Sequence, residues 1–240
     1  MNKKWWLYIG FFLVLLAFFY AFVFSDYDFS ASKLKVINTA VPAFSFTNQD
    51  GKTITQKNTD DKVYVAEYFF TTCKGICPKM NANMRRVFEA YKNEPGFLIL
   101  SHTCMPETDS VPVLKTYEQK MIQGTLIRND DGSFKIAQAQ QEVAQNPNWN
   151  FVTGDKTALY KMARDGYMID NGKPDSSQLI KDQFIHTQFF SLVDKNRRVR
   201  GIYDGLKEDE IEKLLVDIKS LLKEKVDHKR FMNGFDNNPN

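Results

Sequence analysis

Residues 63–78 read VYVAEYFFTTCKGICP, and this stretch decides the fold. Its first eight residues are mostly apolar and rich in β-branched and aromatic types, which predicts a strand inside a sheet. Pro78 suits the first turn of a helix, where its missing N–H costs nothing. Apolar residues then recur at three- and four-residue spacing up to Tyr91. A strand therefore passes into a helix through a segment that carries Cys73 and Cys77.

Similar patterns lie on both sides of this stretch. We expect a β-hairpin over 44–55, strands over 97–102, 150–153, 188–194 and 199–203, and helices over 111–121, 155–165 and 207–224. The polar, Gln-rich segment 123–150 is expected to be a surface insertion with a helix over 133–145. Strands interspersed with helices predict one mixed α/β sheet flanked by helices.

The N-terminal segment differs sharply from the rest of the chain. The run from Trp5 to Phe24 contains no charged residue. At about 1.5 Å per residue it is long enough to cross the roughly 30 Å core of a bilayer. It is also longer than the apolar part of a cleaved signal peptide, so we expect one transmembrane anchor. Lys3 and Lys4 precede it, which predicts a cytoplasmic N-terminus and an exported domain.

We therefore expect a membrane anchor over 1–24, a stalk over 25–40, a folded domain over 41–224 and a polar tail over 225–240. No Arg- and Ser-rich transit peptide precedes the anchor, which favours the bacterial inner membrane with the domain in the periplasm. The formal net charge of +3 includes Lys3 and Lys4, so the exported part is close to neutral. That balance argues against a nucleic-acid partner, because binding to phosphates needs a basic surface.

Cys73 and Cys77 stand four residues apart. If the helix winds from Cys73 onward, both sulfur atoms lie on one helix face, roughly 5–6 Å apart at Cβ. The positive end of the helix dipole would then stabilise their thiolates. Such a pair can chelate a soft metal ion, exchange disulfides with another protein, or form a structural disulfide. No second cluster of cysteines or histidines completes a structural zinc site, and the spacing leaves the three uses open.

His186 is the candidate third metal ligand, because it stands just before an apolar strand in a loop that could face the cysteines. Two thiolates and one imidazole suit Cu(I) and tolerate Cu(II). The alternative is a histidine that caps the strand and bonds to a backbone carbonyl. His228 lies in the polar tail and is expected to be inert.

The other candidate residues have weaker arguments. Cys104 can be a resolving thiol, an accessory ligand or an ordinary small core residue, and the last is the default, since free cysteine packs like a small hydrophobe. His102 faces the same choice. Met80 and Met105 carry thioethers that copper accepts as ligands, although core packing is the expected role of Met80.

Taken together, these motifs resemble the SCO/SenC family, copper-handling thioredoxin-fold proteins used in cytochrome c oxidase assembly. Residues 70–78, FTTCKGICP, look like the family's F-T-x-C-x-x-x-C-P signature. Residues 101–109 resemble its S-x-x-P-E-x-D loop, residues 149–154 its W-x-F-x-T-G motif and residues 184–205 its distal-histidine hairpin. The resemblance implies a thioredoxin-like, copper-binding domain and implies Cys73, Cys77 and His186 as the copper ligands.

The function implied by this resemblance is a membrane-anchored copper chaperone that delivers copper to a respiratory cytochrome c oxidase subunit by ligand exchange. The alternative is a thiol-disulfide oxidoreductase that uses Cys73 and Cys77 as a redox pair to reduce a client before metallation. His186 separates the two, because copper binding needs it and thiol exchange does not. A peroxiredoxin-like peroxidase ranks third, because no arginine is obviously placed beside the thiols.

Overall fold

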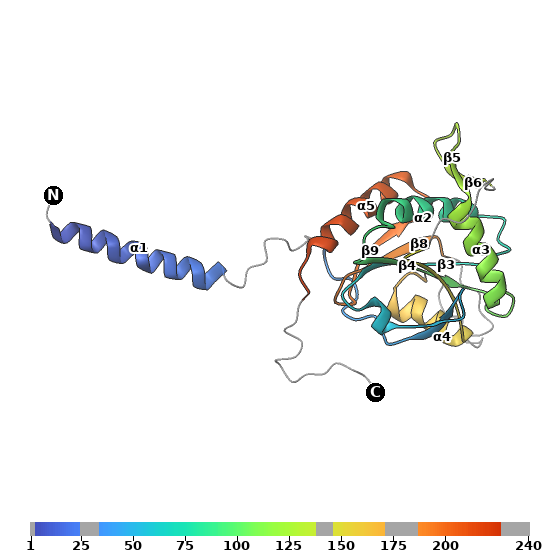
Figure 1. Ribbon diagram of the computed structural model, residues 1–240, viewed down its shortest axis with the longest axis horizontal. Coiled ribbons are helices and arrows are strands. Elements are labelled where there is room, and N and C mark those ends of the chain that lie inside the picture. Colours follow the sequence, from blue (N-terminus) through green and yellow to red (C-terminus); the bar gives the residue numbers. More distant parts are fainter. Residues whose placement is uncertain (1–2, 25–33, 138–145, 171–186, 227–240) are drawn as a thin grey trace.

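The computed structural model describes residues 3–24, 34–137, 146–170 and 187–226. Within them, a seven-stranded sheet with the order β2-β1-β7-β4-β3-β8-β9 forms the centre of the domain (Figure 1). Its strands are β1 (Ser45–Asn48), β2 (Thr53–Thr55), β3 (Val63–Phe69), β4 (Phe97–Thr103), β7 (Trp149–Thr153), β8 (Phe189–Val193) and β9 (Val199–Asp204). A 3-10 turn, η1 (Gln56–Thr59), links β2 to β3. The predicted hairpin over 44–55 is β1 and β2.

The central strands β3 and β4 run parallel, and β4 also runs parallel to β7. The outer pairings, β3 with β8, β8 with β9, and β1 with both β2 and β7, are antiparallel. Every residue of β3 and β4 is buried. Both strands read as nearly continuous apolar runs because helices or loops cover the sheet on both faces.

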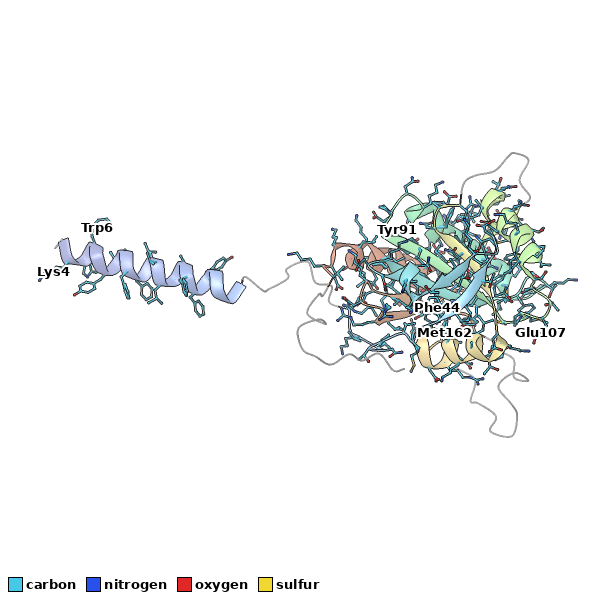
Figure 2. The ribbon with its side chains drawn as sticks, turned by 60° about the horizontal axis from the view of Figure 1, so that its bottom comes forward. Lys4, Trp6, Phe44, Tyr91, Glu107 and Met162 are labelled. Atoms are coloured by element: carbon cyan, nitrogen blue, oxygen red, sulfur yellow. The ribbon has the colours of Figure 1, made fainter. Side chains whose placement is uncertain are left out.

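Alternation along β3 divides the core into two clusters. Val63, Val65 and Phe69 face the helices α2 (Cys77–Tyr91), α3 (Val111–Gln123) and α5 (Glu208–Lys223). Tyr64, Ala66 and Tyr68 face the opposite side, where α4 (Lys156–Lys161) continues into the π-helical turn η2 (Met162–Gly166). Figure 1 shows α2, α3 and α5 on one side of the sheet and α4 on the other. In Figure 2, Phe44 and Met162 mark the α4 side, and Tyr91 marks the α2 side.

The predicted helix over 133–145 is wrong in its first part. Strand β5 (Thr125–Arg128) pairs with β6 (Phe134–Ala137) in a separate two-stranded sheet, and residues 138–145 lie outside the described residues. Gly132 adopts a φ of +80°, which a tight reversal of the chain requires. Phe134 of β6 then packs under the Arg86 guanidinium of α2, 4.3 Å from its ring centre. Packing against α2 therefore stabilises an extended conformation here.

At the N-terminus, helix α1 spans Lys3–Phe24. Among the residues that the structure describes, no helix is long and apolar enough to cross a membrane. Part of the predicted stalk, from Leu34 on, contacts the domain. The backbone of Ile37 donates to the carbonyl of Val199 at 2.8 Å, and Arg200 Nη2 donates to the carbonyl of Leu34 at 2.7 Å. Residues 34–40 therefore lie along β9.

Candidate functional site

The cysteine segment lies where β3 ends. The chain leaves β3 at Phe69, turns through residues 70–76 and enters α2 at Cys77, with Pro78 in the first turn. Cys73 thus lies in the loop, where its N–H donates to the carbonyl of Phe70 at 3.2 Å. The start of α2 agrees with the predicted place of Pro78 in the first turn, and the condition that the helix winds from Cys73 onward is not met. A proline ring clashes with the carbonyl four residues earlier, so a regular helix cannot extend upstream through this position.

The two thiols nevertheless lie near each other on the α2 side of the sheet, and both are free. Cys77 is 5% exposed and packs in the α2-side cluster, whereas Cys73 is half-buried. Burial raises the pKa of the Cys77 thiol well above its usual value, and a hydrogen bond between the two cysteine side chains raises this pKa further. The expected thiolate stabilisation by the helix N-terminus is therefore outweighed by desolvation at Cys77. Cys73 is the accessible sulfur of the pair, and Cys77 is the enclosed one.

Behind the thiols lies a buried carboxyl group that the sequence analysis did not single out. Glu67 of β3 is fully buried and accepts a hydrogen bond from Ser101 Oγ at 2.5 Å. Ser101 in turn accepts one from Trp149 Nε1 at 2.8 Å. Glu67 Oε2 has no hydrogen-bond partner among the described residues. Burial raises the pKa of Glu67 to about 8 and outweighs the opposing effect of the Ser101 hydrogen bond. The only available signal was one acidic residue within an apolar strand.

A second buried carboxyl group joins the cysteine loop to its neighbours. Asp109 lies between β4 and α3 and is 0% exposed. Its Oδ1 accepts a hydrogen bond from Thr71 Oγ1 at 2.6 Å, and its Oδ2 accepts from the N–H of Thr71 at 3.2 Å. Oδ2 also accepts from Thr103 Oγ1 at 2.5 Å. The start of the cysteine loop and the end of β4 are therefore bonded to one carboxyl group.

Cys104 lies on the opposite face of the sheet from Cys77. It is 3% exposed and belongs to the α4-side cluster. Its N–H donates to the carbonyl of Phe69 at 2.8 Å, and its carbonyl accepts from Tyr160 Oη at 2.9 Å. Burial raises the pKa of this thiol far above its usual value. The environment of Cys104 is that of the small core residue expected by default.

His102 and Met80 are also core residues. The His102 ring stacks on Tyr68 with centroids 5.0 Å apart and meets the edge of Tyr167 at 5.2 Å. Burial lowers the pKa of His102 to about 4, so the ring is neutral at pH 7. Met80 is 1% exposed in the α2-side cluster, as its predicted packing role requires. Met105, half-buried, packs against the α4-side cluster.

The third predicted ligand, His186, lies outside the described residues. Within the part of the chain that the structure describes, no group of three or more Cys, His, Asp or Glu side chains is arranged to hold a metal ion. The two neighbouring thiols supply soft donors that suit Cu(I), so a three-ligand site needs one more donor. Strand β8 pairs antiparallel with β3, with Ala66 opposite Ser191. The start of β8 is consequently at the same end of the sheet as the cysteine loop.

Comparison with known proteins identifies relatives of this arrangement. The SCO1/SenC family model matches residues 34–128. The SCO1 protein homolog of Bacillus subtilis (strain 168) is 28% identical over 186 residues, which is 77% of this chain and 83% of that protein.

Solved structures of SCO1/SenC and Sco proteins are also similar to this chain. A SCO1/SenC family lipoprotein from Bacillus anthracis str. Ames is 30% identical, with a TM-score of 0.60 over 78% of this chain and 97% of that one. BsSco, a member of the Sco family of cytochrome c oxidase assembly proteins for which a disulfide switch was identified, is 26% identical, with a TM-score of 0.59 over 80% and 98%. A copper-bound structure of Bradyrhizobium japonicum ScoI shares the fold at 18% identity, with a TM-score of 0.53 over 76% and 99%. With its mixed sheet, its helices on both faces and its cysteine loop after the central strand, the chain belongs to the SCO1/SenC family.

Proposed function

We propose that this protein binds copper through Cys73, Cys77 and His186 and passes it to a subunit of cytochrome c oxidase. The observation that carries the proposal is the pair of free thiols that lie near each other at the end of β3, one half-buried and one buried. Thiolates are the preferred ligands of Cu(I). Sco relatives have been solved with copper bound, and BsSco belongs to a family of oxidase assembly proteins.

His186 is proposed as the third ligand. Thr187, the residue that follows it, is buried, and its hydroxyl donates to the carbonyl of Ile169 at 2.6 Å. The N–H of Gly205 donates to the carbonyl of Gln188 at 2.8 Å. These bonds hold the chain just after His186 at the end of the sheet from which the cysteine loop departs. This position supports a role for the histidine beside the thiols.

Transfer of the metal to a partner follows from the unequal burial of the two cysteines. An incoming thiolate or imidazole reaches the half-buried Cys73 more readily than Cys77, which is 5% exposed. Cys73 is therefore the first ligand to be exchanged, and Cys77 holds the metal ion until the partner has supplied a second ligand. Each thiol loses its proton when the metal binds.

A membrane anchor remains a proposal based on the sequence. The uncharged run from Trp5 to Phe24, preceded by Lys3 and Lys4, supports a single-pass anchor in the bacterial inner membrane with the domain in the periplasm. Protease added to intact spheroplasts should digest residues 41–224 and leave a membrane-bound N-terminal fragment. Recovery of the whole chain in the soluble fraction after cell breakage would reject the anchor.

The copper site is tested by metal content and Cu(I) affinity of the full-length chain in detergent. Wild type should bind one copper ion, and Cys73→Ser, Cys77→Ser and His186→Ala should each weaken binding by tenfold or more (about 1.4 kcal/mol). Cys104→Ser and His228→Ala are matched controls that remove the same residue types outside the proposed site. Full copper affinity in His186→Ala would remove the histidine from the ligand set.

Thiol-disulfide exchange is the second candidate function, favoured by the same asymmetry. An accessible sulfur that attacks and a buried sulfur that resolves are the parts of a dithiol exchange reaction. The released electrons and protons would go to the disulfide of the client protein, and Cys73 and Cys77 would become the new disulfide. If this is the function, His186→Ala should exchange disulfides at the wild-type rate.

A further inference from the structure

The buried carboxyl group of Asp109 contacts the cysteine loop without contributing to the proposed ligand set. It joins three parts of the chain, because Thr71 begins the cysteine loop, Thr103 ends β4, and Asp109 itself stands two residues before α3. The loop that carries it is folded back, since the N–H of Asp109 donates to the carbonyl of Met105 at 2.9 Å. The N–H of Met105 in turn donates to Thr103 Oγ1 at 3.0 Å.

The balance of charge around Asp109 is unusual. In the described ranges no lysine or arginine forms an ion pair with this carboxyl group, although it is completely buried. A buried carboxyl group without a cation depends on its hydrogen bonds for compensation. Two of its three bonds come from Thr71, through both the backbone and the hydroxyl. The position of Thr71 is therefore strongly determined.

The loop beyond Thr71 has few other attachments. Thr72, Lys74, Gly75 and Ile76 are exposed, and Cys73 is half-buried. The loop is thus held at one end by Thr71 on Asp109 and at the other by Cys77 at the start of the helix. Cys73 is two residues from the first point and four from the second. It can remain near Cys77 only while both ends stay in place.

We propose that Asp109 is a positioning residue for the thiol pair, holding the loop through Thr71 so that Cys73 stays near Cys77. Loss of this placement weakens metal binding and shifts disulfide formation while every ligand remains present. The metal-binding part rests on the proposed function, whereas the disulfide part does not need copper.

The test uses the full-length chain in detergent and two readouts, Cu(I) affinity and the equilibrium constant of Cys73–Cys77 disulfide formation in glutathione buffers. Asp109→Asn places an amide N–H₂ against the donors of Thr71, and Thr71→Val removes only the hydroxyl. Both should lower Cu(I) affinity about tenfold and change the disulfide constant by a similar factor, as expected for one lost charge-assisted hydrogen bond. Thr71→Ser keeps the hydroxyl and should restore both values.

Asp194→Asn is the matched control. Asp194 is also a buried carboxyl group, 1% exposed, and it bonds to Arg200 at 2.8 Å. It follows Val193, which pairs with Tyr64 near the start of β3, at the opposite end from the cysteine loop. This variant should lower the melting temperature and leave both readouts unchanged.

The possible results distinguish the positioning role of Asp109 from the proposed binding of copper. If Asp109→Asn and Thr71→Val lower the melting temperature but keep both wild-type readouts, Asp109 is only structural and the inference is rejected. If wild type binds no Cu(I), the proposed function fails, and the disulfide constant still decides on the positioning role. Should Asp109→Asn fail to fold, Thr71→Val, which keeps the carboxyl group, provides the answer.

Discussion

At the residue scale, Glu67 shows what burial does to a carboxyl group. Its pKa is about 8 in the folded protein, whereas an exposed glutamate titrates near 4.5. Between these values the folded state holds a proton that the unfolded state has lost. Stability associated with this group is therefore complete below about pH 4.5 and decreases as the pH rises toward 8.

We predict that Glu67→Gln removes this pH dependence. The free energy of unfolding of the wild type should fall by about 1–2 kcal/mol between pH 6.5 and pH 8, since each pKa unit corresponds to about 1.4 kcal/mol. Glu67→Gln should show a much flatter profile in urea denaturation over the same range. Glu94→Gln, at an exposed position, should follow the wild type. A wild-type slope in Glu67→Gln would mean that another group titrates.

The pKa of His102 is shifted in the opposite direction from that of Glu67. Its pKa is lowered to about 4 by burial, so the unfolded state binds a proton that the folded state refuses between about pH 6.5 and pH 4. Stability should therefore also fall as the pH drops through this window. Together with Glu67, this places the highest stability at mildly acidic pH, where unfolding curves recorded in half-unit steps should show a maximum. A maximum above pH 8 would contradict the raised pKa of Glu67, and a level profile between pH 4 and pH 4.5 would contradict the lowered pKa of His102.

At the element scale, periodicity predicted the central strands and the long helices well. β3, β4 and α5 match their expected ranges to within one or two residues, because each carries a continuous apolar pattern. Pro78 was expected in the first turn of a helix, and α2 begins at Cys77, one residue before it. The β5–β6 hairpin was missed because the segment was interpreted as a surface insertion with a helix, although Asp131-Gly132 is a typical hairpin turn and β6 packs on α2.

The junction of α3 with the hairpin offers a test at this scale. A Cβ atom on Gly124 would lie 2.1 Å from Ile136 Cγ2 and 2.7 Å from the carbonyl of Lys120. Gly124→Ala should therefore cost about 1–3 kcal/mol through overpacking. Gly96→Ala is the control, because its nearest neighbours lie at 3.5 Å, an ordinary contact. Thermal unfolding of both variants measures the difference, and equal melting temperatures would show that the hairpin yields freely.

At the scale of the whole molecule, Arg200 connects distant parts of the chain. Its guanidinium bonds to Asp194 at 2.8 Å, to Glu224 at 2.8 Å and to the carbonyl of Leu34 at 2.7 Å. These partners belong to the β8–β9 turn, the end of α5 and the segment before the domain. The side chain is 5% exposed, and Arg198 also pairs with Asp194, at 2.7 Å. No sequence pattern revealed this link.

We predict that Arg200→Ala lowers the free energy of unfolding by about 1.5–3 kcal/mol, because it removes charge-assisted hydrogen bonds to two buried carboxylates while Arg198 stays paired with Asp194. Lys207→Ala removes an exposed partner of Asp204, and its effect should stay below about 1 kcal/mol. Guanidinium unfolding followed by tryptophan fluorescence measures both. A loss below 1 kcal/mol in Arg200→Ala would show that water compensates the acids.

Part of the candidate site could be predicted from the sequence, and part depends on contacts that only the fold creates. Cys73 and Cys77 carry a recognisable spacing, so the sequence was sufficient to single them out. Glu67 and Asp109 act through contacts with residues that lie far away in the chain, Ser101 and Thr71, and only the fold brings those together. Their roles are set by burial, which residue type alone does not reveal.

The central sheet has one more consequence, which concerns oxidation. A protein in an oxidising compartment can join any two of its cysteines, and a wrong pair would block the right one. Here Cys77 lies in the cluster on one face of the sheet and Cys104 in the cluster on the other, while Cys73 lies near Cys77. Cys104 is 3% exposed, and its N–H is bonded to the carbonyl of Phe69. Oxidation of the folded chain should therefore yield one species, with Cys104 still reduced.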